Sequence, residues 1–305
     1  EPRAPVSATL AIKMSNLRFK IYAPLHDFQW DGHDFELAPS VWIRHLRKPP
    51  DLAGMHEWLS KDEWDRASGA TYWLMYEWTA GVVPSAGEVE NLVLLSLWLV
   101  KPSRAQVAFR FEIGCDGADG KKSRQRLLDR FMWVPGSIHL DFDTGDLQSA
   151  ARFYKTLSAL CSARGRLNNA LLLALGGCWA HDWQVSLICH AAAAEAILTF
   201  STGPGITRRL ATAYACLTEP QSSTRDAAFR EFTSLYSNRS DIMHGRTHNV
   251  AMADRLPTLV RFQELLRKLW TVVCSSPALI AVLEGSDAQR EVHFNTLQQG
   301  YSPPP

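Results

Sequence analysis

The chain has 305 residues, of which 46% are hydrophobic and 21% are charged, and its formal net charge is +1. This composition excludes a disordered or fibrous chain and a strongly basic protein built to bind polyanions. The length exceeds the roughly 100–200 residues of an average domain, so we expect two domains. Six cysteines without a CxxC pair favour a reducing compartment, and no run of about 18 uncharged apolar residues occurs. We therefore predict a cytoplasmic protein that does not contact a membrane.

The first part of the chain, residues 1–140, predicts a β-rich domain. Segments rich in apolar and aromatic residues indicate strands at 8–14, 17–25, 34–39 and 41–46. Residues 91–100 and 105–113 are separated by a short segment that contains proline, which is typical of a β-hairpin. A short helix is expected at 123–133. We interpret this domain as a sensor or regulatory module whose ligand the sequence does not specify.

From residue 146 onward the apolar residues recur with the period of a helix. We predict helices at 147–162, 167–200, 206–217, 224–243 and 255–274, with a break in the second at Gly176-Gly177. Residues 146–280 then form a helical bundle, joined to the first domain by a linker near 135–145, and 285–305 form a flexible tail. The fold class predicted is α+β, with a β-rich domain followed by an all-α bundle.

The segment "LYSNRSDIMHG" carries the chemistry that the sequence offers. Arg239 lies seven residues after Phe232, so a continuous helix places it on the apolar face. A charge there costs several kcal/mol (on the order of the buried-ion penalty) unless it is paired or meets an anion. His244 follows five residues later and points about 140° away on a regular helix. Gly245 supplies a natural end to the helix beside it.

This R-x4-H arrangement resembles the motif of the HEPN superfamily. The match is nearest to ApeA-like HEPN domains, since Tyr236 precedes the arginine, Ser240 follows it and Gly245 follows the histidine. The upstream segment "HAAAAEAIL", with Glu195, resembles the alanine- and glutamate-bearing helix of that family. The resemblance covers about residues 147–275 and implies an all-helical HEPN bundle.

The resemblance also implies a function. Many HEPN domains are endoribonucleases that use no metal and no cofactor, often in anti-phage defence, abortive infection or toxin-like growth arrest. They form homodimers in which two motifs build one composite site. By this resemblance His244 is the general acid/base for attack of a ribose 2′-OH on the adjacent phosphate, and Arg239 binds that phosphate. The N-terminal domain would then respond to a phage-derived trigger or a regulatory partner.

Other polar residues take supporting places in this hypothesis. Ser240, Glu195 and Tyr236 are expected to support the motif, and Arg246, Arg208 and Arg209 to contact the RNA backbone. Many active members have Asn, Asp or His where this chain has Ser240. The alternative is a non-catalytic HEPN module for dimerisation or for RNA or protein binding. In that case Arg239 pairs with an internal carboxylate such as Glu195 or Asp241, and His244 caps the helix.

Overall fold

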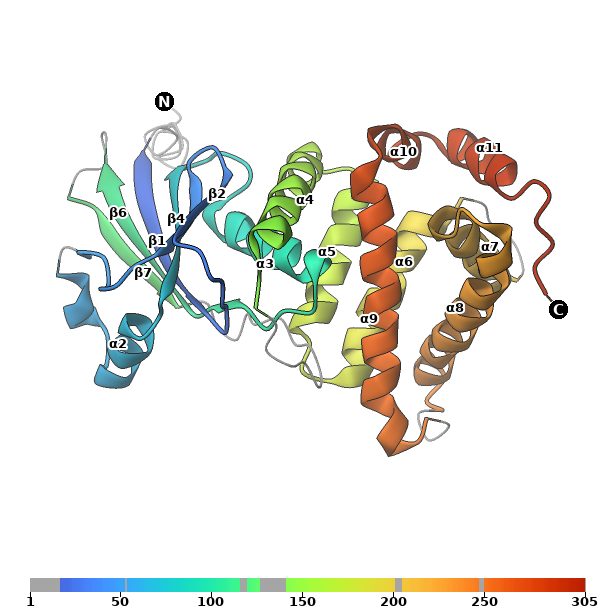
Figure 1. The fold of residues 1–305 in the computed structure, drawn as a ribbon, viewed down its shortest axis with the longest axis horizontal. Helices are drawn as coiled ribbons and strands as arrows, with labels where there is room; N and C mark the ends of the chain where they lie inside the picture. Colours follow the sequence, from blue (N-terminus) through green and yellow to red (C-terminus); the bar gives the residue numbers. More distant parts are fainter. Residues whose placement is uncertain are drawn as a thin grey trace, which may run out of the picture. The chain divides into compact units, whose positions relative to one another are not determined.

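The structure is a computed structural model, and it describes residues 17–52, 54–115, 120–126, 141–200, 205–246 and 250–304 (Figure 1). An antiparallel sheet is followed by a series of helices, which confirms the predicted α+β class. The chain divides into two compact units, residues 1–132 with 138–158 and residues 133–137 with 159–305. The division falls within helix α4 (Thr144–Ala163), so most of this helix belongs to the first unit rather than to the predicted bundle.

The first unit is built on one antiparallel sheet with the order β2-β3-β4-β1-β6-β7, and a short strand, β5, also pairs with β1. The predicted strands at 17–25, 34–39 and 41–46 are confirmed, whereas 8–14 lies outside the described residues. The strands are β1 (Arg18–His26), β2 (Asp34–Ala38), β3 (Val41–His45), β4 (Tyr72–Thr79), β5 (Gln106–Val107), β6 (Phe109–Cys115) and β7 (Lys122–Arg126).

Both faces of the sheet bury apolar side chains, because neighbouring residues of a strand point to opposite sides. One face packs toward helix α3 (Ala86–Val100), to which Tyr76 of β4 donates a 2.9 Å hydrogen bond at the carbonyl oxygen of Ala86. The other face buries Trp73 and Phe111 together with Ala70. Trp64 of helix α2 (Lys61–Ser68) packs against this second cluster, and a 3-10 turn (Met55–Trp58) precedes α2 in the chain. The core of the first unit therefore lies on two sides of one sheet.

The hairpin predicted from 91–100 and 105–113 is wrong in its first strand, because 91–100 are the last ten residues of α3, whereas 105–113 contain strand β5 and most of β6. Ser85 starts the helix by accepting from the backbone N–H of Glu88, whose side chain accepts in return from the backbone of Ser85. Most of α3 is buried, so its sequence is apolar on every side and shows no helical period. The helix predicted at 123–133 is also corrected, since Lys122–Arg126 is strand β7; 127–133 lie outside the described residues.

Three charged groups are buried between the sheet and α3. Arg110 of β6 contacts Glu90 of α3 (Nη1–Oε2, 3.2 Å) and Glu112 of β6 (Nε–Oε1, 2.9 Å). Tyr76 donates a 3.1 Å hydrogen bond to Glu90, and burial beside this carboxylate raises the pKa of its hydroxyl well above the usual value. Arg110, Glu90 and Glu112 are 5%, 1% and 8% exposed. Each charge therefore depends on its partners, because water does not reach it.

The second unit is helical and is centred on α6. Helix α6 contacts α5, α7, α8 and α9. The helices are α5 (Arg166–Trp179), α6 (Trp183–Leu198), α7 (Ile206–Thr218), α8 (Ser222–Met243), α9 (Met252–Ser275), α10 (Pro277–Leu283) and α11 (Asp287–Leu297).

The predicted helix 167–200 is two helices, and the break lies at 180–182 instead of at Gly176-Gly177. The carboxylate of Asp182 accepts from the backbone N–H groups of Gln184 and Val185 and so starts a new helix. The two glycines remain helical inside α5. The boundary between α5 and α6 is therefore set by the N-cap residue Asp182, and the two glycines, although they weaken a helix, do not interrupt α5.

The segment predicted as a flexible tail, 285–305, contains α11 and packs on the unit. Phe294 is fully buried and stacks on Phe200 with ring centroids 4.8 Å apart. Further along, the carbonyl oxygen of Pro303 accepts a 2.9 Å hydrogen bond from Arg208. Only one large apolar residue of α11 is fully buried, so its sequence gives little sign of burial.

No single helix of the described chain is long and apolar enough to cross a bilayer. Helices α9 and α10 meet the length and hydropathy only when taken together, and they are bent by 106° at their junction.

Replacing Gly177 by alanine is expected to destabilise the protein by about 1–3 kcal/mol, the usual cost of overpacking. A Cβ at Gly177 would lie 2.6 Å from atoms of the buried His190 ring on α6. The matched control is Gly176→Ala, since a Cβ there meets nothing nearer than the sulfur of Cys189 at 3.9 Å. This control gains up to about 1 kcal/mol from helix propensity. Denaturant unfolding of both variants checks the difference, and equal midpoints would contradict the packing.

Acid is expected to destabilise the helical unit through His190. This ring is fully buried, with its Nε2 3.2 Å from the amide nitrogen of Gln263, and burial lowers its pKa from 6.5 to about 3. Between these values the unfolded chain binds a proton that the folded chain does not, so stability falls as pH falls from 6.5 toward 3. The loss reaches about 1.4 kcal/mol per pH unit.

Thermal unfolding against pH checks this. The His190→Gln variant is expected to show a shallower acid slope than the parent, although its starting stability is lower. His33→Gln, at an exposed position, is the control and is expected to keep the parental slope.

Candidate functional site

Arg239 lies in the last third of α8, and its guanidinium meets α6. Its Nη2 is 3.2 Å from Oε1 of Glu195, and Tyr236, one turn earlier, donates a 2.5 Å hydrogen bond to the same oxygen. The Cζ of Arg239 is also 5.9 Å from the centroid of the Tyr236 ring. We call these residues the Glu195–Tyr236–Arg239 cluster. The sequence predicted Arg239 on the apolar face of its helix. That face packs on α6, which brings Arg239 to Glu195.

The cluster is half-buried and strongly polarised. The side chains of Arg239 and Glu195 are 32% and 22% exposed, whereas Tyr236 is buried. Burial, together with the hydrogen bond to Glu195, raises the pKa of the Tyr236 hydroxyl above its usual 10, so it remains a donor. The Nε of Arg239 is buried without a hydrogen-bond partner among the described residues. The guanidinium has five donors, and the ion pair with Glu195 uses one nitrogen, so the group keeps capacity for an anion.

His244 stands at the end of α8, where the sequence predicted the helix to stop. Its backbone N–H donates to the carbonyl oxygen of Ser240 at 3.1 Å, and Gly245 follows with φ of +72°. The left-handed conformation suits glycine and ends the helix. The His244 side chain is exposed, and none of the described side chains forms a hydrogen bond with its imidazole. It is therefore accessible to a ligand or to another chain.

Within one chain the structure brings together Arg239, Tyr236 and Glu195 but does not join His244 to them. Arg239 and His244 are five residues apart, which corresponds to about 7.5 Å along the helix axis. Ser240 lies between them, partly exposed, and contributes its backbone carbonyl to the helix end. Arg239 thus lies in the last two turns of α8, and His244 is the residue that caps this helix.

The three arginines expected to contact RNA are not grouped. Arg246 follows His244 and pairs with Asp241 at 3.0 Å. Arg208, by contrast, lies on α7 with its Cζ 5.7 Å from the ring of Phe229. Phe229 precedes Arg239 by ten residues, or about 15 Å of helix. Arg209 is next to Arg208 in the first turn of α7. Of these three arginines, only Arg246 lies near the motif. Arg208 and Arg209 lie on α7 and do not form a common group with it.

A groove beside Glu195 was not predicted from the sequence. It has a volume of about 400 Å³ and is lined by Arg166, Asn169, Ala192, Glu195, Ala196 and Thr199. Arg166 donates to the carbonyl oxygens of Ala196 and Thr199, both at 2.6 Å, and so fixes the end of α6. Glu195 therefore both lines this groove and pairs with Arg239. The only sequence signal for it was the alanine spacing of α6.

Among the described residues no group of three or more His, Cys, Asp or Glu side chains is arranged to hold a metal ion. The titratable side chains at this end of α8 include those of the Glu195–Tyr236–Arg239 cluster, of His244 and of the pair Arg246 and Asp241.

No protein-family model, no curated protein and no solved structure matches the chain.

Proposed function

We propose that the protein is a metal-independent endoribonuclease of the HEPN type that works in the cytoplasm as a homodimer. The observation that supports this most is the end of α8. There an exposed imidazole, His244, follows an arginine, Arg239, that Glu195 and Tyr236 hold from the side. An imidazole can accept and donate a proton and a guanidinium can hold two phosphate oxygens, so the two groups suit RNA cleavage without a metal.

In this mechanism His244 of one copy removes the proton from a ribose 2′-OH. The 2′ oxygen attacks the adjacent phosphorus, the bond to the 5′ oxygen breaks, and the His244 imidazolium of the second copy gives that oxygen a proton. Arg239 binds the non-bridging oxygens and stabilises the charge that develops on them. The products are a 2′,3′-cyclic phosphate and a 5′-hydroxyl. Glu195 and Tyr236 act by positioning Arg239, and Ser240 is a further donor near the phosphate.

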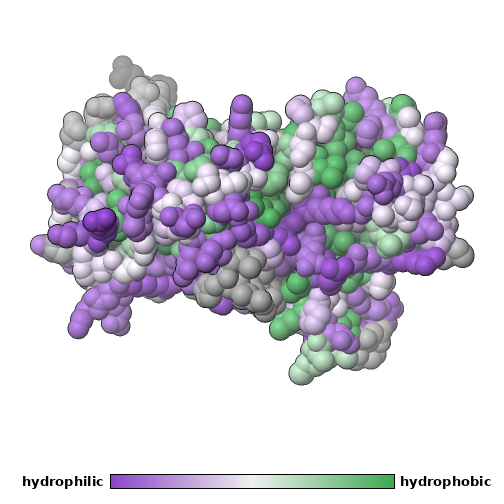
Figure 2. All heavy atoms as spheres, in the orientation of Figure 1, coloured by the Kyte–Doolittle hydropathy of each residue, from purple (hydrophilic) through white to green (hydrophobic). Residues whose placement is uncertain are grey.

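An apolar surface near the motif supports the pairing of two copies. Met243, at the end of α8, is 55% exposed, and Met252 and Leu256, at the start of α9, are 80% and 45% exposed. Figure 2 shows apolar atoms at this beginning of α9. Such side chains gain by burial against a second chain. We further propose that the first unit regulates cleavage in response to a phage-derived trigger, as part of anti-phage defence or growth arrest.

The second candidate is a non-catalytic module for dimerisation or for binding RNA or protein. It is favoured by the ion pair between Arg239 and Glu195, which already provides the guanidinium with a carboxylate. It is favoured too by the place of His244 at the C-cap of α8, a position that a histidine can fill without any role in catalysis.

The test is RNA cleavage by the full chain in excess EDTA, with single-stranded transcripts and tRNA as substrates. The expected result is cleavage that resists chelation and leaves 2′,3′-cyclic phosphate ends. Intact RNA after incubation with folded, dimeric protein would favour the non-catalytic module. Cleavage that EDTA abolishes would contradict the proposed mechanism outright.

A further inference from the structure

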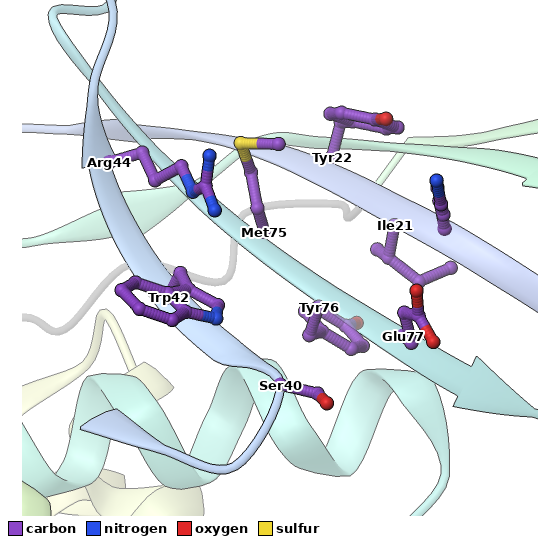
Figure 3. Close-up of a pocket in the computed structure, with 9 residues that line it drawn as sticks. Ile21, Tyr22, Ser40, Trp42, Arg44, Met75, Tyr76 and Glu77 are labelled. Carbon is purple, nitrogen blue, oxygen red and sulfur yellow. The ribbon is translucent and has the colours of Figure 1, made fainter. Parts of the chain in front are cut away.

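The first unit has a pocket of about 290 Å³ on the side of the sheet that also bears α2. It lies over β1, β3 and β4, and α2 packs beside Trp73 and Phe111, farther along the same face. In Figure 3 the side chains of Arg44, Met75 and Tyr22 follow one another across these strands, with Trp42 next to Arg44. The side chains on this face of the pocket are those of Lys20, Tyr22, Trp42, Arg44, Met75 and Glu77.

The centre of the pocket is a row of three apolar side chains. Trp42 is the cross-strand partner of Met75, and Met75 is the partner of Tyr22. All three are only partly buried. Since neighbouring strands lie about 4.8 Å apart, Trp42 and Tyr22 start about 9.6 Å from each other, with Met75 between them. A planar ring that enters above Met75 reaches one or both aromatic rings at the 4.5–7 Å spacing that stacking prefers.

A positive charge flanks each end of this row. Arg44 is two residues beyond Trp42 on β3, opposite Trp73, and Lys20 is two residues before Tyr22 on β1, opposite Glu77. Since β1 and β3 are both antiparallel to β4, the two cations lie at diagonally opposite corners of the row. The Lys20 side chain is exposed and forms no ion pair with any residue that the structure describes.

Arg44 is only loosely held. Its Nε is buried without a hydrogen-bond partner among the described residues, and its nearest carboxylate, that of Asp34, is 3.9 Å away. Its Cζ lies 5.1 Å from the Trp42 ring. The acid inside the pocket, Glu77, is paired with Arg18 at 2.5 Å. The pocket therefore offers two cations to an anionic ligand, while its one acid is neutralised.

We infer that this pocket binds one nucleotide of a single-stranded RNA, with the base on Trp42 and Tyr22. A nucleotide inside a strand has a phosphate on each side of its base, and these meet Arg44 at one end and Lys20 at the other. A free mononucleotide has its phosphate on one side and engages one cation only. A duplex keeps its bases paired and stacked, so none can enter the pocket. Stacking on aromatic rings accepts every base, so we expect little sequence preference.

This site lies in a different unit from Arg239 and His244, and the inference does not rest on the proposed cleavage. It gives the first unit a ligand class of its own. If the proposed nuclease activity is correct, an RNA bound at this pocket is a candidate substrate. The test of the inference measures RNA binding alone and needs no cleavage.

The experiment measures fluorescence anisotropy of a labelled single-stranded RNA heptamer with the full chain, in a His244→Ala background that keeps the RNA intact. Trp42→Leu and Tyr22→Leu are each expected to weaken binding about 5- to 150-fold, the range for loss of one stacked base. Lys20→Gln and Arg44→Gln are each expected to reduce the slope of log Kd against log salt by about 0.7, the value for one phosphate on a single strand. Lys61→Gln, an exposed lysine on α2, is the matched control and is expected to change neither.

Circular dichroism checks that each variant is folded. Lys20 is exposed, so Lys20→Gln tests the inference even if Trp42→Leu does not fold. Parental affinity in both aromatic variants, or an unchanged salt slope in both Lys20→Gln and Arg44→Gln, would overturn it. So would free uridine monophosphate that binds as tightly as the heptamer, because one phosphate would then suffice.

Discussion

His244→Ala is expected to slow RNA cleavage by about 10²- to 10⁴-fold, the usual contribution of a positioned acid or base. The variant is expected to fold normally. His244 is exposed, its imidazole has no hydrogen-bond partner in the described part of the chain, and surface substitutions of this kind change stability by about 0.5 kcal/mol or less. Single-turnover cleavage of a labelled transcript, set beside the thermal unfolding midpoint, separates the two effects.

Substitution of Arg239, unlike that of His244, is expected to affect both cleavage and stability. Arg239→Ala is expected to abolish cleavage and also to lower stability, because it leaves Glu195 without its cation. Arg239→Lys keeps the charge but loses the planar fork, so we expect a folded protein with little activity. Arg230→Ala, a change at an exposed arginine of the same helix, is the control for charge alone, and this variant is expected to cleave like the parent.

The outcome that would contradict the role of His244 is a parental cleavage rate in His244→Ala. That result would eliminate His244 as the acid or base.

The strands were predictable where one face of the sheet is partly open. In β3 and in the first part of β1, from Arg18 to Ala23, buried and less buried residues alternate, which leaves the period of two that strand prediction uses. Helix α3 lacked this signal because it is buried nearly all round, and its apolar run then resembled a strand. What distinguishes it is the reciprocal cap between Ser85 and Glu88, six residues before the segment that misled the prediction.

The candidate site was predictable in its residues but not in its connections. Helical spacing alone placed Arg239 on a buried face and required a partner or an anion. Glu195 was one of two carboxylates expected to meet it. The choice between Glu195 and Asp241 depends on how α6 packs against α8, across 44 residues of sequence, and Asp241 instead pairs with Arg246.

The pocket on the sheet depends still more on tertiary structure. Its row of Trp42, Met75 and Tyr22 comes from three strands whose register no local pattern specifies. The tryptophans of this unit serve both the core and the pocket, since Trp73 is fully buried while Trp42 is partly exposed.

Arg110→Ala is expected to destabilise the first unit by about 3–5 kcal/mol, the cost of removing one partner from a buried ion pair. The change removes the guanidinium from two carboxylates, Glu90 and Glu112, that are almost inaccessible to water. Arg18→Ala is the matched control, because Arg18 also pairs with a glutamate of this sheet, Glu77, but both side chains are more than 40% exposed. An exposed pair of this kind is worth about 0–1 kcal/mol. Urea unfolding of both variants gives the comparison.

The pH dependence distinguishes a lost charge from lost packing. Without Arg110, two buried carboxylates face each other without a cation, and binding a proton relieves the cost of burying their charges. The folded variant then binds more protons, so its stability relative to the parent recovers as pH falls toward the usual carboxyl range. Arg110→Met fills the space but restores no charge, so it is expected to share this recovery. A deficit that stays constant from pH 7 to pH 4 would show instead that the side chain of Arg110 acts mainly through packing.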